Sequence, residues 1–421
     1  MPRSRHILAM LLVIAIISTG FFLSYDDVHK MSAIVNHDQN KFMGPLSRQQ
    51  PFTTQEPTIQ EPQKETYITY LPHSGFHSQL LAFENAIMMA YYTNRTLLAP
   101  MLRLGTNFDF APLDELRHNY LTQQIDDQDA ILIPWSSLFD LEPLMHKYNV
   151  RILEKTEEPS DGMSDTYLGG EPSDDMIHFV NGSQELRSWK LYDNENNASP
   201  LGSYKEKWTL QQVRNIDKPL LYFGSMFGRG RIMATVPEHQ AFQRFLRQQF
   251  KIIHPGVKHT AERIIDVLGG PSQYIGLQLL SPASGKVKQQ HVIEESIQSL
   301  LTELDLDEMQ MGDNEVTGRG CLDHQQSPKL YLATDLTLPA SNPVLTRLRK
   351  LFPCTIAYQD LVTWNLINNK LEEIKDQQGR NVGHFYIPLV DGIVASRAAK
   401  FFGQQGSGFG QFFQQAWQLE H

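Results

Sequence analysis

Residues 66–102 read TYITYLPHSGFHSQLLAFENAIMMAYYTNRTLLAPML. The run TYITYLP predicts a strand, and the polar run that follows it around Gly75 predicts a loop. Apolar residues then recur at helical spacing between residues 80 and 91, and TLLAPML predicts a second strand. A strand, a tight glycine loop, a helix and another strand form a βαβ unit. Such a unit implies a parallel sheet covered by helices.

The same alternation continues to the end of the chain. Further strands are expected at 129–134, 149–153, 218–228, 274–280, 329–335 and 355–358, and helices at 238–250, 257–268, 292–304, 343–351, 388–402 and 409–419. Residues 155–205 form an acidic insertion that predicts a surface loop. The fold class is therefore α/β, with two Rossmann-like domains at 66–255 and 256–421. A cleft between them is the expected ligand site.

Composition excludes several classes of protein. The 421 residues are 41% hydrophobic and 20% charged, which is typical of globular chains. A formal net charge of −10 argues against a nucleic-acid partner, because such binding needs a concentrated basic face. Two cysteines are too few for a disulfide scaffold or a four-cysteine zinc site.

The N-terminus predicts a membrane anchor. Residues 7–23 carry no charge, and basic residues precede them in the short tail 1–6. A helix of this length covers roughly 25 Å, and the basic flank orients it with the tail in the cytoplasm. We expect an uncleaved type II signal-anchor, with a cleaved signal peptide as the alternative. Residues 24–65, rich in Gln, Pro and Thr, predict a disordered stem.

Two further features agree with a body in the secretory lumen. Three N-x-[ST] sequons are candidates for glycosylation, at Asn94, Asn181 and Asn197, although Asn94 could instead cap a helix. In an oxidising compartment Cys321 and Cys354 could form a disulfide; the alternative is a buried thiol at Cys354 and a free Cys321.

Four glycine-containing loops are candidate binding sites. In the first, around Gly75, we expect a tight turn and backbone N–H groups that receive a diphosphate, with His77 and Gln79 as added donors. In the second, Arg229 and Arg231 lie among three glycines and could contact phosphate. The alternative interpretation is that both loops are only turns and that the arginines of the second loop face solvent.

The other two candidate loops lie in the second half of the chain. Asp335 ends the strand at 329–335, where a side chain can contact a base or ribose, or cap a helix. Ser407 lies in the last glycine turn and could donate to phosphate or cap the final helix. No D-x-D motif lies in a plausible loop between a strand and a helix, because Asp305 and Asp307 fall in an acidic surface run. We therefore expect no metal.

The order of these motifs resembles the GDP-fucose protein O-fucosyltransferase-like family. The resemblance rests on YLPHSGFHSQLLAFENAIMMAYYTNRTLLAPML, LYFGSMFG, KLYLATDLTLPASNPVLTRLRKLFPC and DGIVASRAAKFFGQQGSGFG, and covers about residues 67–415. It implies a GT-B fold, GDP-fucose as donor, inversion at the sugar carbon and residence in the endoplasmic reticulum or Golgi membrane. The donor-binding residues that it implies are Gly75, Phe76, Gln79, Gln278, Asp335, Ser407 and Phe409.

Three donor-site elements depart from that family pattern. The family carries H-x-R where this chain has Gln278 and Leu280, and S-T-F-S where it has a turn containing Gly408. The usual Asn of the first loop is Ser78. Loss of a guanidinium that pairs with the leaving diphosphate should weaken transition-state stabilisation. Replacement charge could come from Lys286 and Lys288, or from the arginines of the second loop.

Three readings of function follow. The first is a type II membrane glycosyltransferase that moves fucose from GDP-fucose to a protein or glycan hydroxyl, with His77 as candidate base. The second is a catalytically impaired relative that binds glycans, proteins or a partner transferase in the lumen. The third is a structural lumenal protein whose glycine loops are only turns.

Overall fold

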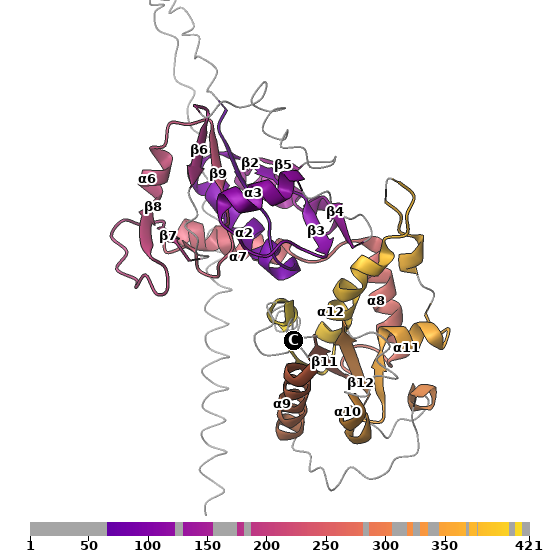
Figure 1. Ribbon diagram of the computed structural model, residues 1–421. Coiled ribbons are helices and arrows are strands. Elements are labelled where there is room, and N and C mark those ends of the chain that lie inside the picture. Colours follow the sequence, from indigo (N-terminus) through magenta and orange to yellow (C-terminus); the bar gives the residue numbers. More distant parts are fainter. Residues whose placement is uncertain are drawn as a thin grey trace, which may run out of the picture. The chain divides into compact units, whose positions relative to one another are not determined.

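The structure, a computed structural model, shows a mixed α/β fold with parallel sheets (Figure 1). The residues it describes are 65–122, 129–154, 175–180, 187–280, 286–304, 318–322, 329–335, 345–367, 370–376, 378–403 and 409–414. They belong to the unit Lys64–His421. Within these ranges no helix combines the length and apolar composition that a membrane span requires. The predicted anchor at 7–23 lies outside them and stays a prediction.

The first sheet contains five parallel strands in the order β5-β2-β1-β9-β6. They are β1 (Tyr67–Tyr70), β2 (Thr96–Ala99), β5 (Ile152–Glu154), β6 (Ile177–Val180) and β9 (Leu220–Phe223). Each is short and largely apolar, as expected of parallel strands that are covered on both faces. The central strand β1 pairs with β2 on one side and with β9 on the other.

Side chains alternate between the two faces of this sheet. Ile68 and Tyr70 belong to the main hydrophobic core, which also contains helix α2 (Phe76–Thr93). Tyr67 belongs to a smaller cluster on the other face. Beside that face, α3 (Leu113–Thr122) contributes Leu113 and Leu116 to a third cluster.

Helix α2 is buried around most of its circumference, since 13 of its 18 residues are buried. A helix that is apolar on all sides is typical of a core position. It ends at Asn94, whose left-handed φ of 53° is a common way to finish a helix. Its buried carboxylate, Glu84, accepts a 2.8 Å hydrogen bond from Nε of Arg247 in α7 (Pro237–Gln249). The ion pair supplies the partner that a buried charge requires.

Smaller elements surround the first sheet. Strands β3 (Leu102–Gly105) and β4 (Ala130–Ile133) form an antiparallel pair, so the strand expected at 129–134 exists but lies outside the parallel sheet. Strands β7 (Trp189–Tyr192), β8 (Glu206–Thr209) and β10 (Ile232–Met233) form a separate parallel sheet. The remaining helical segments are η1 (Trp135–Ser137), α4 (Glu142–Tyr148) and α6 (Leu210–Arg214).

The second large sheet is also fully parallel, with the strand order β13-β12-β11-β14. Its strands are β11 (Ile275–Leu279), β12 (Leu330–Thr334), β13 (Thr355–Ala357) and β14 (Lys400–Phe402). Gly276 is required by packing, because a Cβ there would lie 2.8 Å from the carbonyl oxygen of Ala395 in α12 (Ile387–Ser396).

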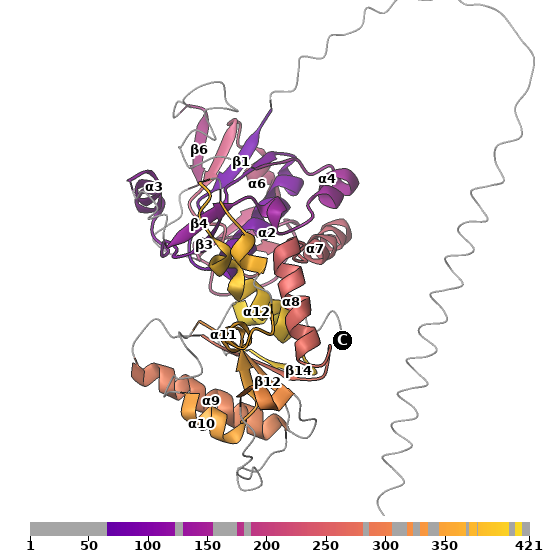
Figure 2. The ribbon, with the colours of Figure 1, turned by 90° about the vertical axis from the view of Figure 1, so that its right-hand side faces the viewer.

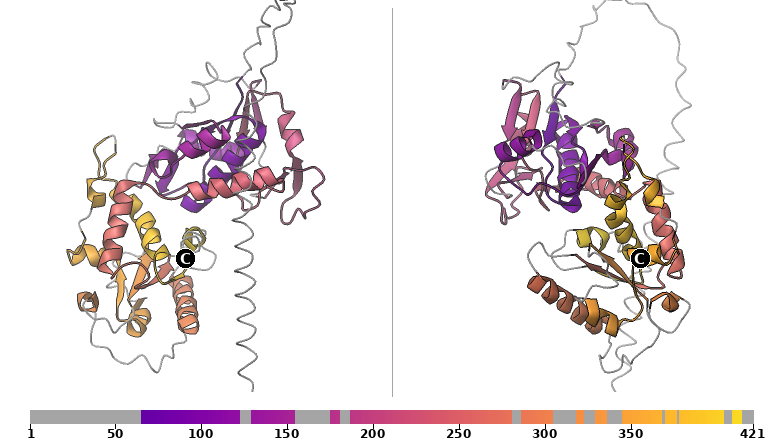
Figure 3. Two further views of the ribbon diagram at one scale, coloured as in Figure 1. Left: turned by 180° about the vertical axis from the view of Figure 1, so that it is seen from behind. Right: turned by 45° about the vertical axis from the view of Figure 1, so that its right-hand side comes forward.

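Helices cover both faces of this second sheet (Figure 2). On one face, α9 (Lys286–Leu304) and α10 (Thr346–Leu351) share an apolar cluster with β11 and β12. On the other face, α12 packs against β11 and β12 and against α8 (Pro255–Val267). Figure 3 shows the same layers from two further directions. The shorter segments are η3 (Gly318–Leu322), α11 (Tyr358–Thr363), η6 (Lys370–Glu373) and η7 (Gly383–Tyr386).

Two expectations about secondary structure are wrong in part. The helix expected at 388–402 ends at Ser396, and Lys400–Phe402 instead pairs with Ile275–Leu277 as strand β14. The run contains no proline or glycine after residue 392 that would mark the boundary, so tertiary pairing sets it. The insertion expected to be loop contains β6 and β7, whose residues pair in sheets.

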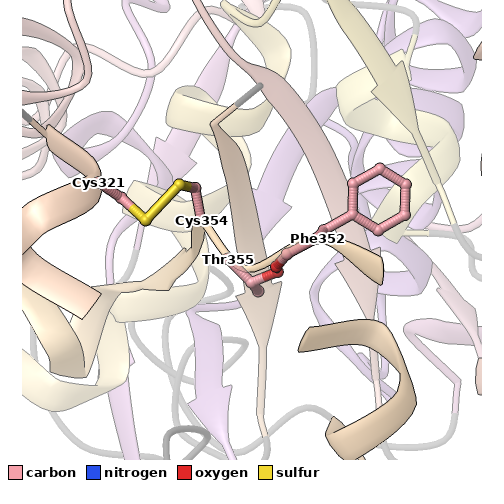
Figure 4. Close-up of a disulfide and its surroundings, with 4 residues drawn as sticks. All are labelled: Cys321, Phe352, Cys354 and Thr355. Atoms are coloured by element: carbon pink, nitrogen blue, oxygen red, sulfur yellow. A yellow bond between two sulfur atoms is a disulfide. The ribbon is translucent and has the colours of Figure 1, made fainter. Parts of the chain in front are cut away.

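A disulfide joins Cys321 of η3 to Cys354, the residue before β13 (Figure 4). The two Cα atoms lie 5.4 Å apart, and the two positions are separated by 33 residues in sequence. Both cysteines are buried. The carbonyl oxygen of Cys354 accepts a 3.0 Å hydrogen bond from the N–H of Leu330 at the start of β12. The disulfide therefore attaches η3 to the edge of the second sheet.

Replacing Cys354 with alanine should lower the free energy of unfolding by about 3–4 kcal/mol, because a cross-link over a loop of this length restricts the unfolded chain. Chemical denaturation measures the loss. Cys321→Ala and the double variant should show the same loss. A reductant should lower the free energy of unfolding of the native protein and leave that of the variants unchanged. Equal stability of native and variant proteins under oxidising conditions would contradict the role of this bond.

Candidate functional site

Strand order identifies one candidate site in each large sheet. In the first sheet the chain adds β2 and β5 on one side of β1, and β6 and β9 on the other. In the second sheet it adds β12 and β13 on one side of β11, and β14 on the other. In both sheets the order of addition reverses at the first strand. Ligands of open parallel sheets bind outside the carboxyl ends of the strands at the point of reversal. The candidate residues are those that follow β1, β9, β11 and β14.

An aromatic contact brings the two sets of residues together. Phe76, the first residue of α2, makes edge-to-face contacts with Phe409 and Phe412, at ring-centroid distances of 5.6 and 5.7 Å. Phe76 follows β1, and the two partners follow β14. The beginning of α2 therefore lies against the segment after the second sheet, as expected if both reversal points serve one site.

The first glycine loop differs in detail from the expected turn. Positive φ falls on Ser74, at 62°, whereas Gly75 has an ordinary φ of −71°. A Cβ at Gly75 would meet no atom within 4 Å, so this glycine is not required by backbone conformation or packing. The expectation of a glycine-dependent turn at residue 75 is therefore wrong. The missing side chain instead leaves space in front of the N-terminus of α2.

Gln79 fixes the shape of this loop. Its side chain is fully buried, and its Nε2 donates to the carbonyl oxygens of Ser74 and Arg103 and to Oδ1 of Asn107, at 2.8–3.0 Å. Its Oε1 accepts from the N–H of Arg103 at 3.0 Å. Both the nitrogen and the oxygen of the amide are hydrogen-bonded to protein groups that hold the loop against β3. Gln79 is therefore a positioning residue and not a direct ligand contact.

His77, the candidate base, lies in the first turn of α2 and is half-buried. Its Nδ1 is buried and has no hydrogen-bond partner among the described residues. Burial, and then the charge of Arg229, lower its pKa to about 4. The imidazole is therefore neutral at neutral pH, and it is a weak base.

His73 connects the loops that follow β1 and β9. Its Nδ1 lies 2.9 Å from Oγ of Ser74, and its Nε2 lies 2.7 Å from Oγ of Ser225. The ring is 4% exposed and makes edge contacts with Phe110 and Phe227. Burial, and then the charge of Arg231, lower its pKa to about 4. His73 is not among the predicted site residues, since its only signal in the sequence is its place directly after a predicted strand.

The two arginines of the second loop differ in exposure. Arg229 is exposed, so its guanidinium is available to a ligand. Its charge also contributes to the lowered pKa of His77. Arg231 is 1% exposed, lies 4.4 Å over the ring of Trp189, and donates to the carbonyl oxygens of Phe227 and Trp189. This guanidinium holds the loop and does not fit the predicted phosphate contact.

Gln278 is a polar side chain on the strand at which the order of the second sheet reverses. It lies on β11 and is 2% exposed. Its Oε1 is buried and has no hydrogen-bond partner in the described part of the chain. A Cβ added to Gly410 would lie 2.3 Å from this oxygen, so a larger residue there would require the end of the Gln278 side chain to shift. Leu280, one residue beyond β11, is half-buried.

Asp335 follows β12 and is exposed, so it can reach a ligand. The same strand contributes to a buried pair in which the hydroxyl of Tyr331 donates to Oδ1 of Asp391 at 2.5 Å. Asp391 also accepts a hydrogen bond from the backbone of Thr334, the last residue of β12. Burial raises the pKa of Asp391 to about 7. Asp391 thus supports the strand end that presents Asp335.

Asp391→Asn should remove a pH dependence of stability. The folded pKa exceeds the ordinary value, so the folded protein binds the proton more tightly, and stability falls as pH rises through 4 to 7. Relative to the variant, native stability should drop by about 2–3 kcal/mol between pH 5 and pH 8. Denaturant unfolding of both proteins across this range measures the difference. Parallel curves would show that Asp391 does not titrate there.

Several predicted residues cannot be placed. Ser407, Gly408 and Asn181 lie outside the described residues, as do Asp305 and Asp307. Lys286 and Lys288 lie on α9, but their side chains are not described. Within the described ranges, no group of three His, Cys, Asp or Glu side chains could hold a metal ion.

The other two sequons can be placed. Asn94 is exposed and is the C-cap of α2. Asn197 is half-buried; its Oδ1 accepts from the N–H of Ser199 at 2.8 Å. Its Nδ2, the atom to which a glycan is attached, is buried and has no partner among the described residues.

Comparison with known proteins gives a likeness in structure only. No protein-family model matches the sequence, and no curated protein matches it. POFUT1 in complex with GDP aligns with a TM-score of 0.42 and 11% identity over 83% of this chain and 94% of that chain. The α-1,6-fucosyltransferase NodZ co-crystallised with GDP aligns with a TM-score of 0.42 and 12% identity over 83% and 92%. Fucosyltransferase NodZ from Bradyrhizobium aligns with a TM-score of 0.41 and 14% identity over 83% of this chain and 92% of that chain. At these values nothing about function follows from the alignment.

Proposed function

We propose that this chain is a glycosyltransferase of GT-B type that uses a nucleotide-sugar donor, with fucosyl transfer from GDP-fucose as the specific reaction. One observation carries the proposal: each large parallel sheet reverses its strand order at its first strand, and the residues after β1 and β14 meet through Phe76 and Phe409. The donor identity rests on the family resemblance of the sequence motifs.

The reaction is a displacement at the anomeric carbon. An acceptor hydroxyl oxygen forms the new bond to that carbon while the bond to the diphosphate breaks, and the configuration inverts. The N-terminus of α2, with open space at Gly75, suits the diphosphate, and the exposed Arg229 can add positive charge there. Neutral His77 is the proposed acceptor of the hydroxyl proton. No metal enters this proposal.

The cellular setting is part of the proposal. A type II anchor at 7–23 would place the body of the chain in the lumen of the endoplasmic reticulum or Golgi, where a protein or glycan supplies the acceptor hydroxyl. The disulfide between Cys321 and Cys354 supports this setting, because disulfides form and persist in oxidising compartments.

A second candidate function is a non-catalytic lumenal binding module. It is favoured by the neutral, buried Gln278 at the place where the family resemblance implies a histidine, and by Leu280 in place of the arginine. The internal use of Arg231 also removes one source of replacement charge. In this alternative the same residues bind a glycan, a protein or a partner transferase without turnover.

Calorimetric titration of the full chain with GDP and GDP-fucose tests the proposal. We expect micromolar binding that persists in chelator, followed by fucose transfer in an acceptor screen. Absence of binding to both nucleotides would overturn the proposed function. Binding without transfer by the native chain, together with transfer by the variant described next, would favour the second candidate.

Gln278→His combined with Leu280→Arg should tighten GDP binding about 10–100-fold, because a charge-assisted contact to the diphosphate is restored. The matched control is Pro271→His combined with Gln273→Arg, which adds the same two side chains at exposed positions before β11. The control should leave the affinity unchanged. Equal tightening by both variants would show a nonspecific effect of charge.

A further inference from the structure

Ser74 occupies a backbone conformation that glycine would adopt more easily. Its φ is 62°, in the left-handed region that disfavours a side chain. Two hydrogen bonds hold it there: its N–H donates to the carbonyl oxygen of Phe108 at 2.6 Å, and its own carbonyl oxygen accepts from Nε2 of Gln79 at 3.0 Å. The fold therefore presents a hydroxyl at the carboxyl end of β1, where glycine would cost less.

The partners of Ser225 decide which nitrogen of His73 carries the proton. Oγ of Ser225 accepts a 3.2 Å hydrogen bond from the N–H of Phe227 and lies 2.7 Å from Nε2 of His73. Ser225 is buried, and these are its hydroxyl's two contacts among the described residues. If Nε2 carried the proton, the Ser225 hydroxyl would be left with no acceptor, which buried polar groups rarely tolerate. The Ser225 hydroxyl therefore donates to Nε2, and the proton of the neutral ring lies on Nδ1.

The position of the His73 proton also determines the direction of the hydrogen bond to Ser74. With the proton on Nδ1, His73 donates to Oγ of Ser74 across the 2.9 Å contact. The Ser74 hydroxyl then has its own proton directed away from His73, at a half-buried position beside the N-terminus of α2. Its single hydroxyl contact among the described residues is this one. A donor held in this way suits an acceptor oxygen of a ligand.

We infer that Ser74 donates a hydrogen bond to a phosphate or sugar oxygen of the bound ligand, and that His73, oriented by Ser225, is the positioning residue that directs this donation. The inference rests on the proposed function for the identity of the ligand. It links the loops after β1 and β9 in one hydrogen-bonded chain, because Ser225 belongs to the second loop and Ser74 to the first.

Variants at Ser74 separate this role from a structural one. Ser74→Ala should weaken binding about tenfold through loss of one hydrogen bond. Ser74→Gly should weaken binding equally while raising the melting temperature, since glycine relieves the positive φ. The control is Ser272→Ala, because Ser272 has a matching φ of 59° and lies before β11, away from the carboxyl ends. A Ser74→Gly protein that is more stable and binds normally would overturn the inference.

Variants at His73 test the direction of the donation. In His73→Asn the amide nitrogen takes the place of Nδ1 and can still donate to Ser74, so affinity should stay near the native value. In His73→Gln the amide nitrogen takes the place of Nε2, so affinity should fall as in Ser74→Ala, with no further loss in the double variant. Equal loss in both His73 variants would show a merely structural role.

The probes are GDP, GDP-fucose, inorganic pyrophosphate and free fucose, titrated into the full chain. If Ser74→Ala weakens the binding of GDP and pyrophosphate, the ligand oxygen that accepts from Ser74 belongs to the diphosphate. If the variant weakens the binding of GDP-fucose and fucose alone, that oxygen belongs to the sugar. Serine-dependent binding of pyrophosphate without nucleotide binding would overturn the proposed function and keep this inference. Nucleotide binding that is unchanged in Ser74→Ala would do the reverse, and binding of no probe would overturn both.

The tautomer has a readout that needs no ligand. Long-range ¹H–¹⁵N spectra of the imidazoles, with His73→Asn to assign the signal, report which nitrogen is protonated. We expect Nδ1–H in the native protein and a shift toward Nε2–H in Ser225→Ala. An Nε2–H ring in the native protein would overturn the inference whatever the binding data show.

Discussion

Parallel strands cannot be joined by a tight turn, and this constraint determines where the polar loops of the molecule lie. Every strand of the two larger sheets is parallel to its neighbours, so each connection must return to the opposite end of the sheet before the next strand begins. The segments that leave the strands therefore collect at one end. His73, Ser74 and Ser225 come together in this way although 152 positions separate the histidine from its second serine.

Neutral polar groups carry much of the organisation at this end of the first sheet. Gln79 holds the first loop through its amide, and Asn85 holds the second through hydrogen bonds to the carbonyl oxygens of Met226 and Gly228 at 2.8 and 3.0 Å. His73 joins the two loops as an uncharged ring. Arg231 is charged, but it is enclosed by aromatic rings and backbone carbonyls. Such a framework is insensitive to salt, because exposed ion pairs contribute little to it.

The local alternation of strands and helices could be predicted from the sequence because it depends on short-range periodicity. The βαβ unit at 66–102 was correctly predicted for this reason. The end of α12 could not be located, because residues 397–399 carry no helix-breaking residue and the following strand exists only through pairing with β11. The roles of individual polar residues could not be predicted either. Arg229 and Arg231 are two positions apart in one loop, yet only the tertiary packing of Trp189 shows which is buried.

The turn at Asn197 constrains when a glycan could be attached to this sequon. An enzyme that attaches an oligosaccharide needs the side-chain nitrogen of asparagine, and here that atom is enclosed while its oxygen closes the turn on Ser199. A glycan at this sequon would therefore have to be attached before the turn forms, whereas the exposed side chain of Asn94 carries no such requirement. In a chain exposed to such an enzyme, the occupancy of Asn197 would thus depend on how quickly this turn forms.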